Sequence, residues 1–291
     1  MDQATALREL VRNSKPTPIN ARVITVTSGK GGVGKSSVAV NLAIAFAKQG
    51  RRVIILDADF GLANVEVMLG VRPTSNLADL MFRNKSIKDI ITEGPDGIGF
   101  ISGGSGIQEM TNLSKEQLIN LSARLTELDE LSDIIIIDTG AGISDAVMEF
   151  VMASSEVLLV ATPEPTSITD AYALLKTLNK KTSFVKEHSK IQLIANRVGD
   201  PDEGLELYNK LSLVVGKFLD ISISYLGSVP KDNLMVKSVM MQKPVMALYP
   251  ESQAARSFEN LASKMLGLEP VAPSGRKGIA GLFFSVLGRR Q

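Results

Sequence analysis

The chain has 291 residues, of which 44% are hydrophobic and 22% charged, so it can bury the core of one large domain or two modest ones. Its net charge of +1 gives no strong field toward DNA or an anionic membrane. We therefore expect no specific nucleic-acid partner, and any membrane binding needs a local patch. The absence of cysteine excludes disulfides, thiolate catalysis and iron–sulfur ligation.

The first 21 residues are predicted to lie outside the main domain. Residues 1–14 have apolar positions on one helical face, which predicts a short helix. Residues 15–21 contain two prolines, which a helix interior does not accept, and are predicted to form a linker. The opening residues lack the apolar core of a signal peptide, so we expect a cytoplasmic protein.

Residues 22–267 are predicted to form an α/β domain with a doubly wound, mostly parallel sheet and helices on both faces. Short apolar runs alternate with longer segments of helical pattern. Several runs are apolar at consecutive positions, which is typical of parallel strands buried on both faces. The predicted strands are 23–28, 53–59, 98–102, 133–138, 157–163, 191–196 and 224–230.

The stretch TSGKGGVGKSS, residues 27–37, follows the first predicted strand and fits two motifs. Gly29, Gly31 and Gly34 have the spacing of a Rossmann dinucleotide fingerprint, and Asp57 at the end of the next strand keeps that alternative open. Lys35 and Ser36, however, follow the last glycine directly. This favours a phosphate loop, in which lysine binds the β/γ-phosphates and serine binds Mg²⁺. The predicted nucleotide-binding residues here are Gly29, Lys30, Gly31, Gly32, Val33, Gly34, Lys35, Ser36 and Ser37.

Three aspartates end apolar strands. Asp138 closes the run DIIIID, where a carboxylate beside a phosphate loop holds Mg²⁺. Asp57 and Asp59 end the second predicted strand, and we expect one to face the metal and the other the attacking water. The order of loop and strand aspartates predicts binding and hydrolysis of a nucleoside triphosphate with Mg²⁺.

Lys30 is a second lysine early in the loop. It cannot easily duplicate Lys35 on the same phosphates. It could instead reach a nucleotide held by a second subunit and neutralise charge there, as an arginine finger does. A solvated lysine is the alternative.

The C-terminal residues 268–275 are rich in Pro, Gly and Ser and are predicted to be a linker. Residues 276–291 are predicted to form a cationic amphipathic helix, about 22 Å long and too short to cross a bilayer. Such a helix can lie in the membrane interface. A helix docked on the protein's own body is the alternative. The apolar face consists of Ile279, Leu282, Phe283, Val286 and Leu287.

KGGVGKSS resembles the deviant Walker A motif of the MinD/ParA family of ATPases, and the similarity extends over about residues 22–267. The segments DADFGLAN and DTGAGI resemble the family's two switches. The resemblance implies that Lys35 and Ser36 bind phosphate and Mg²⁺, and that Lys30 acts across a homodimer around two ATP molecules. It also implies that Asp59 aligns the water, with Asp57 and Asp138 near the metal.

Two further segments carry the same resemblance. TPEPTSITDA resembles the family's dimer-facing segment, which implies Glu164 and Asp170 at the interface. ANR and VPKD resemble its adenine and ribose region, which implies base contacts by Asn196, Arg197 and Pro230. Iron-carrying branches of the family use cysteines, which are absent here.

Residues 2–8, DQATALR, resemble the DQAxxLR motif of the FlhG family, MinD-like regulators of flagellar number and placement. The resemblance implies a slow ATPase switch that binds the inner face of the cytoplasmic membrane reversibly. It also implies stimulation of the GTPase FlhF by the N-terminal helix and contact with flagellar switch-ring proteins. A MinD-type regulator of the division site is the alternative. The implied partner-binding residues are Asp2, Gln3, Ala4, Leu7 and Arg8.

Overall fold

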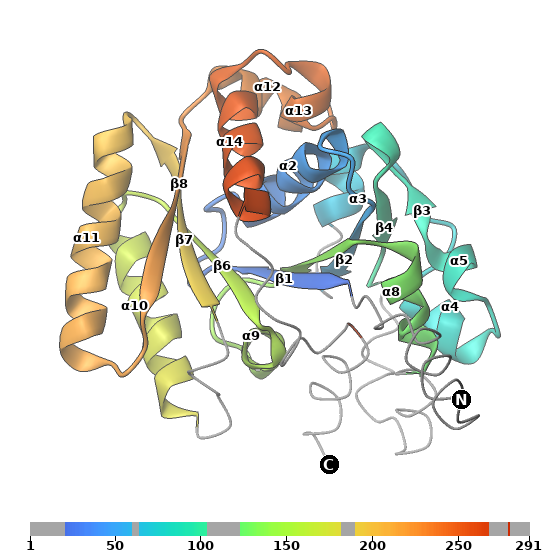
Figure 1. The fold of residues 1–291 in the computed structure, drawn as a ribbon, viewed down its shortest axis with the longest axis horizontal. Coiled ribbons are helices and arrows are strands. Elements are labelled where there is room, and N and C mark those ends of the chain that lie inside the picture. Colours follow the sequence, from blue (N-terminus) through green and yellow to red (C-terminus); the bar gives the residue numbers. More distant parts are fainter. Residues whose placement is uncertain (1–20, 60–63, 104–122, 182–189, 268–278, 280–291) are drawn as a thin grey trace, which may run out of the picture.

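The computed structural model describes residues 21–59, 64–103, 123–181, 190–267 and 279. One central sheet has helices packed against it on both sides (Figure 1). The strands are β1 (Arg22–Thr27), β2 (Val53–Ala58), β3 (Thr92–Glu93), β4 (Gly99–Ile101), β5 (Ile134–Thr139), β6 (Glu156–Ala161), β7 (Lys190–Val198) and β8 (Ile223–Pro230).

The helices connect these strands. They are α2 (Lys35–Lys48), α3 (Asn64–Leu69), α4 (Leu77–Phe82), α5 (Ile87–Ile90), the 3-10 helix η1 (Pro95–Gly97), α8 (Glu127–Leu131), α9 (Asp145–Ala153), α10 (Pro165–Lys180), α11 (Pro201–Phe218), α12 (Asn233–Met240), α13 (Val245–Leu248) and α14 (Gln253–Gly267).

The strand order is β3-β4-β2-β5-β1-β6-β7-β8, and neighbouring strands are parallel except β3 and β4. The predicted α/β fold and its seven strands are confirmed. The antiparallel edge strand β3 was not predicted, because two residues carry no recognisable periodicity.

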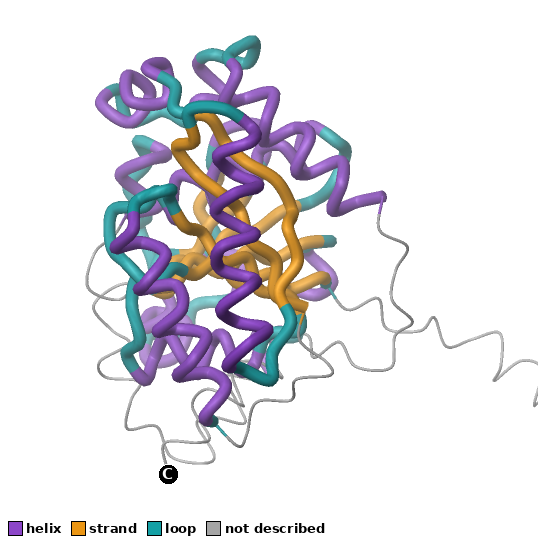
Figure 2. Tube along the Cα trace, turned by 90° about the vertical axis from the view of Figure 1, so that its left-hand side faces the viewer, coloured by secondary structure: helices purple, strands orange, loops and turns teal. Residues whose placement is uncertain are grey.

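Consecutive apolar residues in a strand pack in opposite directions. In β5, Ile134 and Ile136 join a cluster with residues of α2 and α14, whereas Ile135 and Ile137 join a second cluster with residues of α4, α5 and α8. Figure 2 shows helices on both sides of the strands. This two-sided burial explains why the strands read as unbroken apolar runs.

A mostly buried ion pair lies at the end of the sheet opposite the phosphate loop. The Arg22 guanidinium donates to both carboxylate oxygens of Glu156, at 2.7 and 2.5 Å, and to the carbonyl oxygen of Met265 at 2.8 Å. Both side chains of the ion pair are mostly buried. The beginnings of β1 and β6 are thereby joined to the last turn of α14.

The strand register places the predicted site residues at one edge of the sheet. In the parallel pairs, Asp138 of β5 lies opposite Asp57 of β2 on one side and Val26 of β1 on the other. The loop that follows β1 leads directly into α2. The phosphate-loop sequence and two predicted metal-binding aspartates therefore meet at the carboxyl ends of β1, β2 and β5, where α/β proteins bind ligands.

Ile279 is the one residue of the predicted membrane face that the structure describes. We expected this side chain on a lipid-facing helix surface, but it is fully buried in the cluster that α4, α5 and α8 share with the sheet. Its backbone amide hydrogen-bonds the carboxylate of Asp129, which also accepts from the amide of Ala21 at 3.2 Å. Ile279 therefore packs on the protein body in this conformation, as the alternative described.

The other predicted terminal features lie outside the described residues. These are the helix 1–14 with Asp2, Gln3, Ala4, Leu7 and Arg8, most of the linkers 15–21 and 268–275, and Leu282, Phe283, Val286 and Leu287 of the tail.

Candidate nucleotide site

The phosphate loop is held by close backbone packing. A Cβ at Gly29 would lie 2.2 Å from the carbonyl oxygen of Asp170 in α10, and one at Gly34 would lie 2.4 Å from the Nδ2 atom of Asn196. Gly34 also has a φ of 91°, in the left-handed region. Side chains at these two positions would displace the loop, so glycine is required at both.

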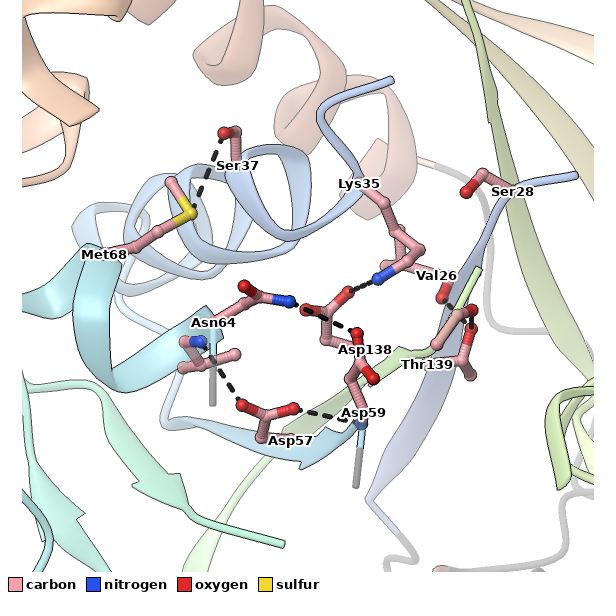
Figure 3. A network of polar contacts seen from close by, with 12 residues as sticks. Val26, Ser28, Lys35, Ser37, Asp57, Asp59, Asn64, Met68, Asp138 and Thr139 are labelled. Atoms are coloured by element: carbon pink, nitrogen blue, oxygen red, sulfur yellow. Dashed lines mark hydrogen bonds and ion pairs between the residues drawn. The ribbon is translucent and has the colours of Figure 1, made fainter. Parts of the chain in front are cut away.

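Lys35 forms a buried ion pair at the first turn of α2. Its Nζ atom lies 2.8 Å from Oδ1 of Asp138, and the two side chains are 7% and 0% exposed (Figure 3). The amino-terminal end of α2 adds a partial positive charge and free N–H groups. A lysine and a helix N-terminus are thus placed where an anionic phosphate group can bind.

One carboxylate oxygen of Asp138 can accept a further ligand. Its Oδ2 atom is buried and has no hydrogen-bond partner among the described residues. Burial raises the pKa of this carboxyl, against the opposing effects of Lys35 and the Ser36 hydroxyl. A buried acceptor that needs positive charge, beside a serine hydroxyl, fits Mg²⁺.

The pKa of Asp57 is also raised. Burial, followed by the nearby charge of Asp138, raises the pKa of Asp57 to about 7, although backbone amides of Asp59 and Val65 act in the opposite direction. These amides donate to Asp57 at 3.1 and 3.3 Å. Two buried carboxyls in adjacent strands repel one another unless a proton or a cation separates them.

Asp59 lies just beyond the end of β2. Its Oδ2 atom accepts a hydrogen bond from Nδ2 of Asn64 at 3.2 Å, and its backbone amide donates to Asp57. Asp57 thus accepts from the backbone of Asp59, while the Asp59 carboxylate contacts Asn64, and the predicted division between metal and water stays a prediction (Figure 3). Asn64 was not singled out from the sequence, although it ends the segment DADFGLAN.

Lys30 is turned toward its own chain. Its Nζ atom lies 3.1 Å from Oε2 of Glu164 and 2.9 Å from the hydroxyl of Thr166, at the beginning of α10. Both side chains of the ion pair are exposed. The two predicted interface residues Lys30 and Glu164 are therefore neighbours on the surface, whereas Asp170 contacts Gly29 through its backbone.

The predicted base-binding residues lie at the ends of β7 and β8. Asn196 is buried and donates through Nδ2 to the carbonyl oxygen of Val33 at 2.7 Å, so it also supports the phosphate loop. Arg197 has a left-handed φ of 59°. Pro230 pairs with Val198 in the sheet.

The residues that follow Pro230 line a cavity of about 690 Å³. The sequence did not predict this cavity, because its wall comes from two segments that are distant in the chain. It is lined by Lys231, Asp232, Asn233, Leu234, Glu251, Ser252 and Gln253.

The acidic groups do not form a self-sufficient metal cage. Within the described residues, no three His, Cys, Asp or Glu side chains are arranged to hold a metal ion. Mg²⁺ usually binds through one or two protein ligands together with substrate phosphates and water. The unpartnered Asp138 oxygen, Ser36 and the lysine beside them fit that mode of binding.

Comparison with known proteins agrees with this geometry. The ParA family model, described as the NUBPL iron-transfer P-loop NTPase, matches residues 20–266. This chain belongs to the ParA family of P-loop NTPases. The iron-transfer part of that description does not extend to it, because the chain has no cysteine to bind an iron–sulfur cluster.

Individual ParA-family relatives cover most of the chain. It is 43% identical to the antiactivator FleN of Pseudomonas aeruginosa, over 84% of this chain and 86% of FleN. It is 33% identical to the flagellum site-determining protein YlxH of Helicobacter pylori, over 91% of this chain and 90% of YlxH. The Mg-ADP complex of the septum site-determining protein MinD from Pyrococcus horikoshii has a TM-score of 0.65 and 25% identity, covering 85% of this chain and 97% of MinD.

The raised pKa of Asp57 predicts how the stability of the fold depends on pH. Its pKa of about 7 in the folded state exceeds the ordinary aspartate value of 3.8, so the folded state binds the proton more tightly. The resulting stabilisation is fully present below the unfolded-state pKa of 3.8 and is lost as pH rises through the folded-state pKa of about 7. The Asp57→Asn variant should lose this contribution.

Thermal unfolding without nucleotide or metal should therefore show a smaller fall in Tm from about pH 5 to pH 8 in Asp57→Asn than in the unmodified protein. The exposed Asp202→Asn serves as the control and should follow the unmodified protein. Equal pH dependence in Asp57→Asn and the unmodified protein would contradict the assignment.

Proposed function

We propose that the chain is an ATPase switch that forms a homodimer around ATP and regulates the number or placement of flagella. The similarity to YlxH, a flagellum site-determining protein, over nine-tenths of both chains supports the flagellar part. The 43% identity with FleN and the DQATALR segment support the same branch of the family. The observation that best supports ATP-dependent dimerisation is the exposed position of Lys30 on the phosphate loop.

Each residue of the site has a role in the proposed hydrolysis. Lys35 and the N-terminus of α2 bind the β/γ-phosphates, while Ser36 and Asp138 hold Mg²⁺ with Asp57 nearby. The bound metal supplies charge neutralisation for phosphoryl transfer. Asp59, oriented by Asn64, aligns the attacking water.

Asn196 supports a preference for adenine. One N–H of its Nδ2 atom donates to the loop carbonyl of Val33, which fixes the amide, and its Oδ1 atom can accept a hydrogen bond. An acceptor can bind the amino group of adenine but not the corresponding oxygen of guanine. Arg197 and Pro230 complete the proposed base region.

Dimerisation requires Lys30 to change partners. In the single chain it pairs with Glu164 and Thr166, and reaching a partner's nucleotide would break these contacts. Exposed ion pairs contribute only about 0–1 kcal/mol, so the exchange costs little. The released Glu164 would then lie at the dimer interface, with Asp170 beside the loop.

Membrane association is proposed to depend on the tail. No helix among the described residues is long and apolar enough to span a bilayer. Reversible binding of a cytoplasmic protein to the inner membrane face would use the apolar positions 279–287. Ile279 must then leave its place beside Asp129.

The proposed partners of the N-terminal segment are FlhF and, for the protein as a whole, the flagellar switch ring. The support is the matching motif with Asp2, Gln3, Ala4, Leu7 and Arg8. A division-site role remains the second candidate, since MinD shares the fold. The lower identity with the MinD structure, 25% against 43% with FleN, favours the flagellar role. Membership of the P-loop NTPases leaves the dinucleotide alternative without support.

The two loop lysines should give different defects. Lys30→Ala should bind ATP as a monomer and fail to dimerise, because its charge acts across the interface. Lys35→Ala should lose about 10- to 100-fold in ATP affinity, because it removes a charge-assisted contact with phosphate. Nucleotide titration and sedimentation with a non-hydrolysable ATP analogue and Mg²⁺ measure both effects.

The exposed Lys180→Ala on α10 is the control for loss of a surface charge and should dimerise normally. Dimerisation of Lys30→Ala equal to that of the unmodified protein would contradict the proposed role of Lys30.

The N-terminal proposal is tested by GTP turnover of FlhF. A peptide of residues 1–20 should stimulate turnover, and the same peptide with Gln3→Ala and Arg8→Ala should not. If neither peptide stimulates turnover, the FlhF proposal is contradicted and the division-site role is favoured. A scrambled peptide of the same composition controls for charge.

A further inference from the structure

The outer face of α12 is an apolar surface without a partner among the described residues. Val236, Val239 and Met240 occupy positions i, i+3 and i+4 and are all exposed, Met240 to 79%. Met241 follows them and is also exposed. The opposite side of the helix faces the core, where Ser238 is buried.

The end of α3 lies against the end of this surface. A Cβ at Gly70 would come within 2.6 Å of the carbonyl oxygen of Gln242, so the chain after α3 touches the chain after α12. Val67, one turn before Gly70, is exposed as well. We name Val67, Val236, Val239, Met240 and Met241 the α12 surface.

Basic side chains without acidic partners lie along the α12 surface. Lys231, Lys237 and Lys243 are exposed, and no described carboxylate pairs with them. Lys237 lies three residues before Met240, on an adjoining part of the helix.

Two of the nearby acids, Asp232 and Glu251, already have partners. Asp232 accepts from the backbone amides of Leu234 and Ala254, and Glu251 pairs with Arg256. The rim of the α12 surface is therefore basic at Lys231, Lys237 and Lys243, whereas Glu66 lies beside Val67 at the α3 end.

We propose that the α12 surface binds an amphipathic helix of another protein, one with acidic residues beside its apolar face. The apolar stripe matches the i, i+3, i+4 pattern of such a helix, and the lysines complement its acids. Methionine side chains adapt to a partner's shape, which suits protein surfaces. This inference goes beyond the proposed function, and only the exclusion of a second copy rests on the proposed dimer.

Position and composition favour this occupant over a second copy of the chain or a lipid surface. The proposed dimer uses Lys30 and the beginning of α10, whereas α12 lies at the top of the molecule in Figure 1 and α10 at its lower left. The α12 surface also lacks the Trp, Phe and Leu side chains of interfacial membrane helices.

Site-specific crosslinking of the full chain tests the proposal. A photoreactive benzoylphenylalanine is placed at the position of Met240 and, as a matched control, at that of Leu213, an apolar residue of α11 that is 74% exposed. The protein is crosslinked in cells of its natural host, and mass spectrometry maps the captured segment. A synthetic peptide of that segment is then titrated against the purified protein.

The expected result is capture at position 240 and not at 213, by a helical segment with acidic flanks. Its peptide should bind about tenfold more weakly to Val236→Ser/Met240→Ser and to Lys237→Glu/Lys243→Glu. Leu205→Ser/Leu213→Ser on α11 should bind it normally. All variants should keep the thermal stability of the unmodified protein, because the changed side chains are exposed.

Four results would overturn the proposal. These are crosslinks at position 240 to lipid, crosslinks to a second copy of the chain, no capture above that at position 213, and a captured segment whose peptide binds the variants as well as the unmodified protein.

Discussion

The buried ion pair between Lys35 and Asp138 is the interaction on which the site depends. It places a cation and an anion in the interior at the carboxyl edge of the sheet, next to the second buried carboxyl of Asp57. Buried charges are costly unless they are paired, and here one oxygen of Asp138 is left without a partner among the described residues. A magnesium ion and phosphates would satisfy these groups together.

The structure connects this cluster to two surfaces. The backbone amide of Val65, at the beginning of α3, binds Asp57, and α3 ends against the chain that follows α12. On the other side, Gly29 packs on α10, whose first turn holds Lys30 through Thr166. The metal-binding edge is thus in direct contact with α3 on one side and, through the phosphate loop, with α10 on the other.

Much of the fold and the centre of the site could be predicted from the sequence. Unbroken apolar runs identified the parallel strands, and residues at strand ends converge because parallel strands end at one edge. Contacts that depend on side-chain direction could not be predicted. The Lys30–Glu164 pair joins residues 134 positions apart, and the burial of Ile279 depends on a hydrophobic cluster assembled from α4, α5, α8 and the sheet. An amphipathic pattern alone does not distinguish lipid from a protein groove.

The most direct test of the account is the number of protons released when Mg²⁺ and ATP bind. Calorimetric titrations near pH 7 in two buffers with different ionisation enthalpies give this number. Since the pKa of Asp57 lies at about 7 without the metal, binding should release a proton fraction that disappears in Asp57→Asn. Equal proton release by Asp57→Asn and the unmodified protein would contradict the claim that the buried acids form the magnesium–nucleotide site.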